Sequence, residues 1–160
     1  MKLSAKLTES VNAQIGREFF ASIQYVAMAA WFEEQGLPGF AKYFYKQATE
    51  ENEHALKFVR YVAEVDAQVA IPAIPEPRRG WSTVQDVLRA YLEAEEDVTR
   101  RIWAIAETAQ AEKDLSTLEF VQWFVAEQRE EESSARSLLD RAKRLGEERV
   151  ALLDATLGGE

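Results

Sequence analysis

The segment Glu50-Glu51-Asn52-Glu53-His54 contains side chains that could bind a metal ion inside a protein core. His54 is the only histidine in the 160-residue chain, and it lies three positions after Glu51. Residues three apart on a helix share a face, so a carboxylate oxygen and an imidazole nitrogen can reach the same point. Carboxylate-bridged di-iron sites are built inside helical bundles with this Glu-x-x-His spacing.

Glu51 also interrupts a stripe of apolar residues at helical spacing. Every third or fourth position of this stripe faces the same side, and its members are Phe44, Ala48, Glu51, Ala55, Phe58, Val62 and Val65. A carboxylate buried in such a stripe needs a compensating partner. The alternative for this segment alone is a core histidine that is hydrogen-bonded and binds no metal.

Three further segments repeat the pattern of an apolar seam that contains polar residues. The first seam is Leu7, Val11, Ile15, Glu18, Ser22, Tyr25, Ala29 and Phe32. The next is Val84, Leu88, Tyr91, Glu95, Val98, Ile102, Ile105 and Ala109. The last is Val121, Phe124, Gln128, Glu131, Ala135, Leu138, Ala142 and Leu145. The alternating spacings of three and four predict four long helices that pack as a bundle.

The segments between the seams predict how these helices are connected. Gly36-Leu37-Pro38-Gly39 indicates a tight turn, whereas residues 67–83 contain three prolines and Gly80 and indicate a long crossover. Asp114 and Ser116 are both plausible N-caps for the fourth helix. Gly146 should end it, and residues 147–157 leave room for a short fifth helix. We therefore expect an all-α, four-helix bundle formed by one domain over residues 1–160.

The polar residues of the four seams are predicted to meet at one level of the bundle. A single constant shift along the chain carries Glu18 to Glu95, Glu51 to Gln128 and His54 to Glu131, which suggests a pseudo-twofold site. Carboxylates that converge in a dry core repel one another and are stable only when protonated or neutralised by cations. A mostly oxygen site with one histidine suits iron or manganese. A structural polar network without metal is the alternative.

A second group of carboxylates flanks these seams. Glu127 and Glu130 are three apart beside the fourth seam, and Glu50 lies next to Glu51. These three side chains could bind a further cation, or they could be part of a solvated helix face.

Composition limits the classes of partner and compartment. The chain has 19 basic and 28 acidic residues and a net charge of -9, which argues against a nucleic-acid or acidic-membrane partner. It contains no cysteine, so disulfides, thiolate catalysis and iron-sulfur ligation are excluded. We found no apolar run of membrane-spanning length and no signal-peptide pattern near residue 1, so we expect a cytoplasmic protein.

Together, the helix order, the long crossover, Glu51-x-x-His54 and the segment from Trp123 to Glu131 resemble the bacterial non-haem ferritins. This resemblance covers nearly the whole chain. It implies a hollow shell of twenty-four subunits that oxidises Fe(II) with O2 or H2O2 at a di-iron centre and stores ferric mineral inside.

The resemblance also implies roles for individual residues. The first iron site corresponds to Glu18, Glu51 and His54, and the second to Glu51, Glu95 and Glu131 with Gln128 nearby. The third iron site of these ferritins corresponds to Glu50, Glu127 and Glu130, with Glu131 as an additional candidate ligand. Tyr25 corresponds to the tyrosine beside the centre.

Two positions distinguish the chain from the haem-containing bacterioferritins. The second Glu-x-x-His of that group is here Gln128-x-x-Glu131, and its haem-ligating methionine is here Asn52. Haem is therefore not expected. A di-iron oxidase or peroxidase of the rubrerythrin type, which works without a shell, is the alternative function, and a purely structural bundle is another.

Overall fold

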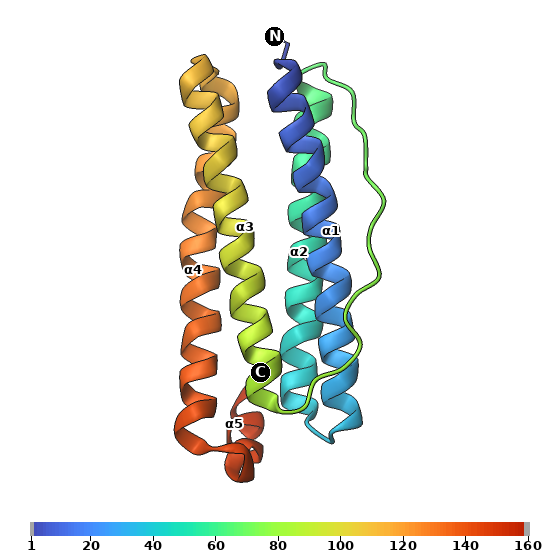
Figure 1. The fold of residues 1–160 in the computed structure, drawn as a ribbon, viewed down its shortest axis with the longest axis vertical. Coiled ribbons are helices and arrows are strands. Elements are labelled where there is room, and N and C mark those ends of the chain that lie inside the picture. The colour runs from blue at the N-terminus through green and yellow to red at the C-terminus, as the bar shows by residue number, and fades with distance from the viewer. Residues whose placement is uncertain (1, 159–160) are drawn as a thin grey trace.

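The computed structural model describes residues 2–158, which form a bundle of long helices with a short helix at one end (Figure 1). The elements in chain order are α1 (Ala5–Glu34), α2 (Pro38–Glu64), α3 (Val84–Glu112), α4 (Leu115–Leu145), the 3₁₀ helix η1 (Glu147–Arg149) and α5 (Val150–Leu157). This architecture confirms the predicted all-α bundle with a short fifth helix.

The four long helices form two antiparallel pairs, α1 with α2 and α3 with α4 (Figure 1). The predicted crossover follows α2 and runs along the length of the bundle beside α1 (Figure 1). It returns the chain to the end where α2 began, so α2 and α3 run in the same direction. All four seams can therefore face one shared core.

Helix ends in the bundle are fixed by local hydrogen bonds. The side chains of Ser4, Thr83 and Asp114 accept hydrogen bonds from backbone amides in the first turns of α1, α3 and α4. Asp114, rather than Ser116, is therefore the N-cap of α4. The turn before it uses Lys113 in the left-handed region, at a φ of 58°.

Side-chain amides of α1 tie the crossover to the bundle at two points. Asn12 donates to the carbonyl of Gln68 and accepts from the amide of Ala70, each at 2.9 Å. Gln24 makes the same pair of bonds to the carbonyl and amide of Arg78, at 3.1 and 2.9 Å. These bonds satisfy backbone groups of a segment that has no helix or strand partner of its own.

The short helix α5 is held against the start of α2. A carboxylate oxygen of Asp154 accepts the Phe40 amide hydrogen bond at 2.8 Å. A Cβ at Gly39 would lie 1.9 Å from the Asp154 carbonyl oxygen, so only glycine allows the two backbones to approach this closely. The glycine that follows the turn into α2 therefore also permits the docking of α5.

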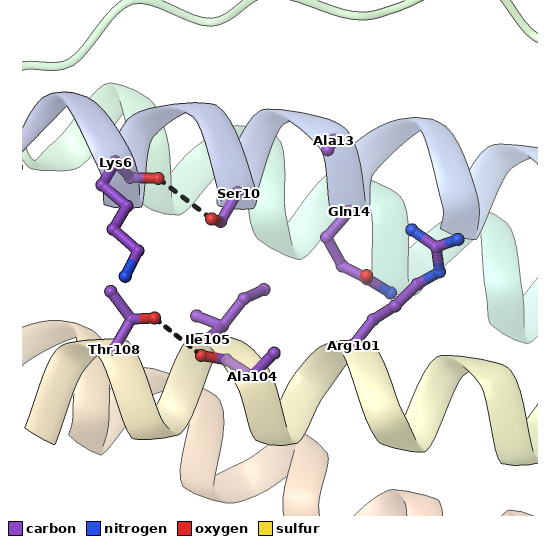
Figure 2. Close-up of a pocket in the computed structure, with 8 residues that line it drawn as sticks. All are labelled: Lys6, Ser10, Ala13, Gln14, Arg101, Ala104, Ile105 and Thr108. Atoms are coloured by element: carbon purple, nitrogen blue, oxygen red, sulfur yellow. Dashed lines mark hydrogen bonds between the residues drawn. The ribbon is translucent and has the colours of Figure 1, made fainter.

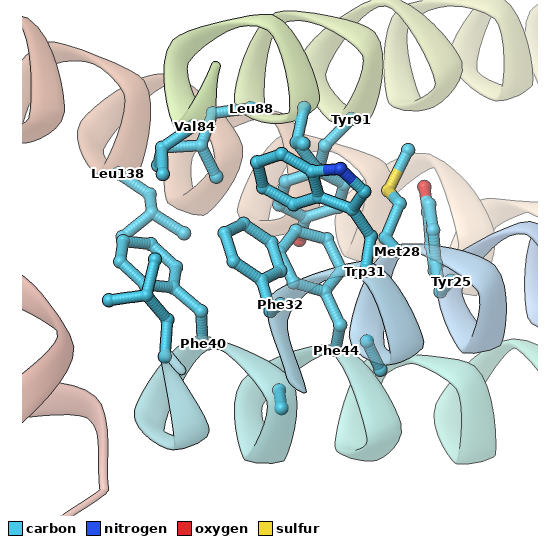
Figure 3. Close-up of a cluster of buried hydrophobic side chains, with 14 of the residues drawn as sticks. Tyr25, Met28, Trp31, Phe32, Phe40, Phe44, Val84, Leu88, Tyr91 and Leu138 are labelled. Carbon is cyan, nitrogen blue, oxygen red and sulfur yellow. The ribbon is translucent and has the colours of Figure 1, made fainter. Parts of the chain in front are cut away.

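The bundle core consists of two apolar clusters with a polar layer between them. One cluster surrounds Phe32 and Phe44 (Figure 3), and the other surrounds Phe58 and Phe124. The layer between them holds the polar seam residues, which are Glu18, Glu51, His54, Glu95, Gln128 and Glu131. Among the described residues, no helix is both long enough and apolar enough to cross a membrane.

Candidate metal centre

All four long helices contribute to the polar layer, and the layer is inaccessible to solvent. Glu18, Glu51 and Glu95 are 0% exposed, and His54, Gln128 and Glu131 are between 1% and 5% exposed. Burying one unpaired carboxylate is costly, and here several share one layer. Their burial therefore requires compensation by protons or cations.

Ligand atoms in this layer form two groups of three residues. The first group is Glu18, Glu51 and His54, and the second is Glu51, Glu95 and Glu131. Within each group, one donor atom from every residue lies within 4.8 Å of the others. The imidazole Nδ1 of His54 is 3.5 Å from a Glu51 oxygen and 3.9 Å from a Glu18 oxygen. Glu51 belongs to both groups and can bridge two ions.

The donor atoms of the first group have few protein partners. Oε2 of Glu18, both carboxylate oxygens of Glu51 and Nδ1 of His54 are buried without a protein hydrogen bond. Buried polar atoms are normally paired, so these unpaired atoms indicate a ligand between them. Carboxylate oxygens with a single nitrogen are a donor set that suits iron or manganese.

Burial changes the acidity of every carboxyl group in the layer. It raises the pKa of Glu18 well above the ordinary value, with a further contribution from Glu51. It also raises the pKa of Glu51, and Glu95 adds to that rise. Burial raises the pKa of Glu131 to about 8 and that of Glu95 to about 7. Without a cation, the layer therefore retains protons near neutral pH.

Neutral side chains orient these carboxylates. Gln14 donates a 2.8 Å hydrogen bond to Glu18, and the Tyr25 hydroxyl donates to Glu95. Gln128 donates to the other Glu95 oxygen at 3.1 Å and to the Glu95 carbonyl at 3.2 Å. Gln128 therefore holds the Glu95 carboxylate in place. The sequence analysis did not predict the role of Gln14. Gln14 lies four residues before Glu18 and therefore on the same face of the helix, which could have indicated the contact.

Comparison with known proteins places this bundle in a family. Residues 8–145 match the family described as Ferritin, a ferritin-like domain. The chain belongs to this family. It is 36% identical over 146 residues to a bacterial non-heme ferritin of Staphylococcus haemolyticus, covering 91% of this chain and 88% of the relative. A bacterial non-heme ferritin of Campylobacter jejuni is 34% identical over 145 residues, covering 91% and 87%.

Solved structures agree with the ferritin assignment. An open pore ferritin from the archaeon Archaeoglobus fulgidus superposes with a TM-score of 0.95 at 37% identity, covering 99% of this chain and 98% of the other. An engineered closed form of the same ferritin gives the same TM-score and identity. The predicted resemblance to bacterial non-haem ferritins is confirmed, and membership of this family supports a role in iron storage.

The residues predicted for a third ferritin-type iron site lie at the edge of the layer. Glu50 and Glu127 are partly buried, and their charges raise the pKa of Glu131. Glu130 is exposed. Over residues 2–158, the groups of converging ligand atoms do not include Glu50, Glu127 or Glu130. The third site therefore stays a prediction.

A groove between α1 and α3 lies outside the carboxylate layer (Figure 2). It has a volume of about 310 Å³, and Lys6 and Arg101 give its walls positive charge. Gln14 lines this groove and reaches Glu18. Positive walls repel Fe(II), so the groove is unsuited to holding iron.

Proposed function

We propose that this protein stores iron and is a ferroxidase, oxidising Fe(II) to Fe(III) with O2 or H2O2 as oxidant. The observation that carries this proposal is the position of Glu51. It belongs to both groups of ligand atoms, and both of its oxygens are buried without a protein partner.

In this proposal two Fe(II) ions are substrates that bind side by side. Glu18 and His54 bind one ion and Glu95 and Glu131 the other, while Glu51 binds both. Each ion can give one electron, so an oxidant that needs two is reduced without release of a one-electron product. Gln14, Tyr25 and Gln128 keep the carboxylates in place through the hydrogen bonds described above.

The assembly and its setting belong to the same proposal. We infer a closed shell of twenty-four copies in the cytoplasm, without haem and without a nucleic-acid or membrane partner. The description of the Archaeoglobus fulgidus neighbour as an open pore ferritin supports an assembly with pores. The net charge of -9 favours attraction of Fe(II).

Substitution of the shared ligand tests the proposed chemistry. Glu51→Ala removes the residue common to both ion sites, and His54→Ala removes the only nitrogen donor. Loss of groups outside the ligand shell already costs about 10- to 100-fold in activity, so each ligand variant should lose at least about 100-fold in the rate of Fe(II) oxidation. Stopped-flow absorbance after mixing Fe(II)-loaded protein with O2 measures this rate.

The matched control is Glu53→Ala, because Glu53 is an exposed carboxylate on the same turn of α2. It should oxidise Fe(II) at the wild-type rate. Circular dichroism should show the helices of all three variants intact. Wild-type oxidation by Glu51→Ala or His54→Ala would refute the assignment of the centre.

A further inference from the structure

His54 is oriented without a hydrogen bond from the protein. Over residues 2–158, no group hydrogen-bonds to either of its ring nitrogens, and Nδ1 is buried and unpaired. A histidine that binds a metal usually donates its second ring nitrogen to a carboxylate or a carbonyl, and that bond fixes the orientation of the ring. Nδ1 nevertheless faces Glu51 and Glu18, at 3.5 and 3.9 Å from their oxygens. Other contacts must therefore hold the imidazole.

Two aromatic rings of α4 pack against this imidazole. The ring of Trp123 lies 5.5 Å from that of His54 at an interplanar angle of 76°, and the ring of Phe124 lies 5.7 Å away at 83°. The two rings of α4 are also nearly perpendicular to each other, at 87° with centroids 4.9 Å apart. Edge-to-face contacts are favourable and depend on the orientation of the rings. These contacts therefore limit rotation of the His54 side chain.

Lys57 covers the ring of Trp123. Its ammonium nitrogen lies 3.2 Å from the centre of that ring, and it forms no ion pair with a carboxylate of residues 2–158. Trp123 is 43% exposed whereas Phe124 is 1% exposed, so core packing restrains Phe124 more than Trp123. A cation is attracted to the face of an indole. His54 and Lys57 are three apart on α2, so one face of the helix presents both side chains to Trp123.

We propose that Trp123 is a positioning residue for His54 and that Lys57 holds Trp123 in place. The inference rests on the proposed function, because it concerns the ion site that contains His54. A ring that is already held in the binding orientation loses less conformational freedom when an ion binds. Lys57 therefore strengthens cation binding at this site, although its own charge repels a cation. The other ion site contains no histidine and does not depend on Trp123.

The direction of the effect separates this role from simple electrostatics. Lys57→Met keeps an apolar stem and removes the charge. If the ammonium only repelled cations, its removal would strengthen Co(II) binding. If the ammonium holds Trp123, its removal weakens Co(II) binding, and Lys57→Arg keeps wild-type affinity because it retains a cation over the indole. Lys46→Met is the matched control, since Lys46 is an exposed lysine of the same helix.

Anaerobic titration of the full-length protein with Co(II), followed by visible absorption, measures the affinity of the two ion sites. The binding step that is lost in His54→Ala identifies the site that contains His54. Trp123→Leu should weaken this step by at least about tenfold, as when the group that orients a metal-binding histidine is removed. Lys57→Met should weaken the same step by about two- to fivefold, as expected for a partly exposed cation–π contact. The other step should not change.

A double variant tests whether Lys57 acts through Trp123. In a protein that already carries Trp123→Leu, the change Lys57→Met should no longer weaken Co(II) binding, because no indole remains for the ammonium to hold. Circular dichroism should show intact helices in every variant. Trp123 is partly exposed, so its replacement by leucine leaves the core closed.

Three results would overturn the inference. One is Lys57→Met that binds Co(II) at least as tightly as the wild type. Another is unchanged Co(II) binding in Trp123→Leu, which would leave Phe124 alone to orient His54. The third is equal weakening of both binding steps, which would show a general loss of structure. A wild type that binds no Co(II) would overturn the inference together with the proposed function, whereas one that binds Co(II) without oxidising Fe(II) would refute the proposed function alone.

Discussion

Glu51 couples the two halves of the candidate centre, because both ion positions depend on its carboxylate. Its burial is tolerable when cations neutralise it, and otherwise burial raises its pKa so that it retains a proton. Cation binding must therefore displace protons, which makes affinity depend on pH. The same carboxyl groups connect metal binding with the stability of the fold.

The raised pKa values predict a particular pH dependence for the metal-free protein. Glu95 and Glu131 have folded-state pKa values of about 7 and about 8, above the ordinary 4.5 expected after unfolding. Between these values the folded state binds more protons than the unfolded state, so stability falls as pH rises. We expect the melting temperature measured with chelator to fall from pH 5 to pH 8 and then level off.

Two comparisons check this interpretation. Glu131→Gln cannot ionise and should flatten the decline, and saturating Co(II) should remove most of it. A melting temperature that rises between pH 5 and pH 8 in the metal-free wild type would show that these carboxyl groups are not protonated as described.

The outer carboxylates give a separate prediction. If Glu50, Glu127 and Glu130 hold a third cation, Glu127→Ala combined with Glu130→Ala should change the Fe(II) consumed per O2 and slow recovery of the centre. The first rapid oxidation should change little, because both ligand groups remain. Oxygen uptake during two successive additions of Fe(II) measures this. Unchanged stoichiometry and recovery would assign Glu127 and Glu130 to a solvated face.

Sequence periodicity predicted which residues enter the layer and missed much of what surrounds them. Glu18, Glu51 and Glu95 interrupt apolar seams, so their burial follows from helical spacing. The hydroxyls of Tyr43 on α2 and Tyr91 on α3 lie 3.2 Å apart. This contact depends on the rotation of α2 relative to α3, and Tyr43 lies outside the seam of α2. Helical spacing along the sequence does not specify how two helices are rotated relative to each other.

Turn residues predicted the ends of the helices more clearly than they predicted how the crossover is held. Asp114 was a recognisable N-cap, and Gly146 ends α4 as expected. Asn12 and Gln24 looked like ordinary polar positions on a helix. Their role depends on a segment more than fifty residues away in sequence, so local patterns gave no sign of it.

The contact between α1 and the crossover is testable at Gly16. A Cβ at this position would lie 2.3 Å from Cγ of Pro72, and overpacking of this kind costs about 1–3 kcal/mol. Glycine inside a helix is ordinarily less stable than alanine, so destabilisation by Gly16→Ala would reverse the usual order. Guanidinium unfolding monitored by circular dichroism measures the difference.

Gly80→Ala is the control, because a Cβ there meets nothing within 4 Å. It should leave the unfolding midpoint nearly unchanged. A Gly16→Ala variant as stable as the wild type would mean that the crossover shifts away from α1 at little cost.

Exposed apolar side chains on α1 and the crossover indicate a surface that is covered on assembly. Ile23 and Val26 of α1 are 42% and 46% exposed, and Ile71 in the crossover is 55% exposed. Residues 23 and 26 share a face of the helix. Apolar side chains exposed together on one helix face, as those of Ile23 and Val26 are, can mark an interface between subunits.

We predict a large closed homo-oligomer, twenty-four copies of the 18.2 kDa chain. Light scattering after size exclusion should report this mass, with salt varied because contacts between charged subunits are screened. Val26→Glu should shift the population to smaller species, whereas Glu9→Ala at an exposed position of α1 should not. A wild-type monomer or dimer at every salt concentration would favour a di-iron oxidase that works without a shell.

The polar layer between the two apolar clusters has a consequence for how the chain unfolds. A continuous apolar core makes a small domain open as one unit, whereas regions joined by weaker contacts open separately. Here the polar layer, in which metal-free carboxyl groups face one another, crosses the middle of all four helices. We therefore expect the two ends of the bundle to open as separate cooperative units, although they share helices. Iron bound at the layer would link the two ends of the bundle. Iron content would then also determine whether the subunit unfolds in one step.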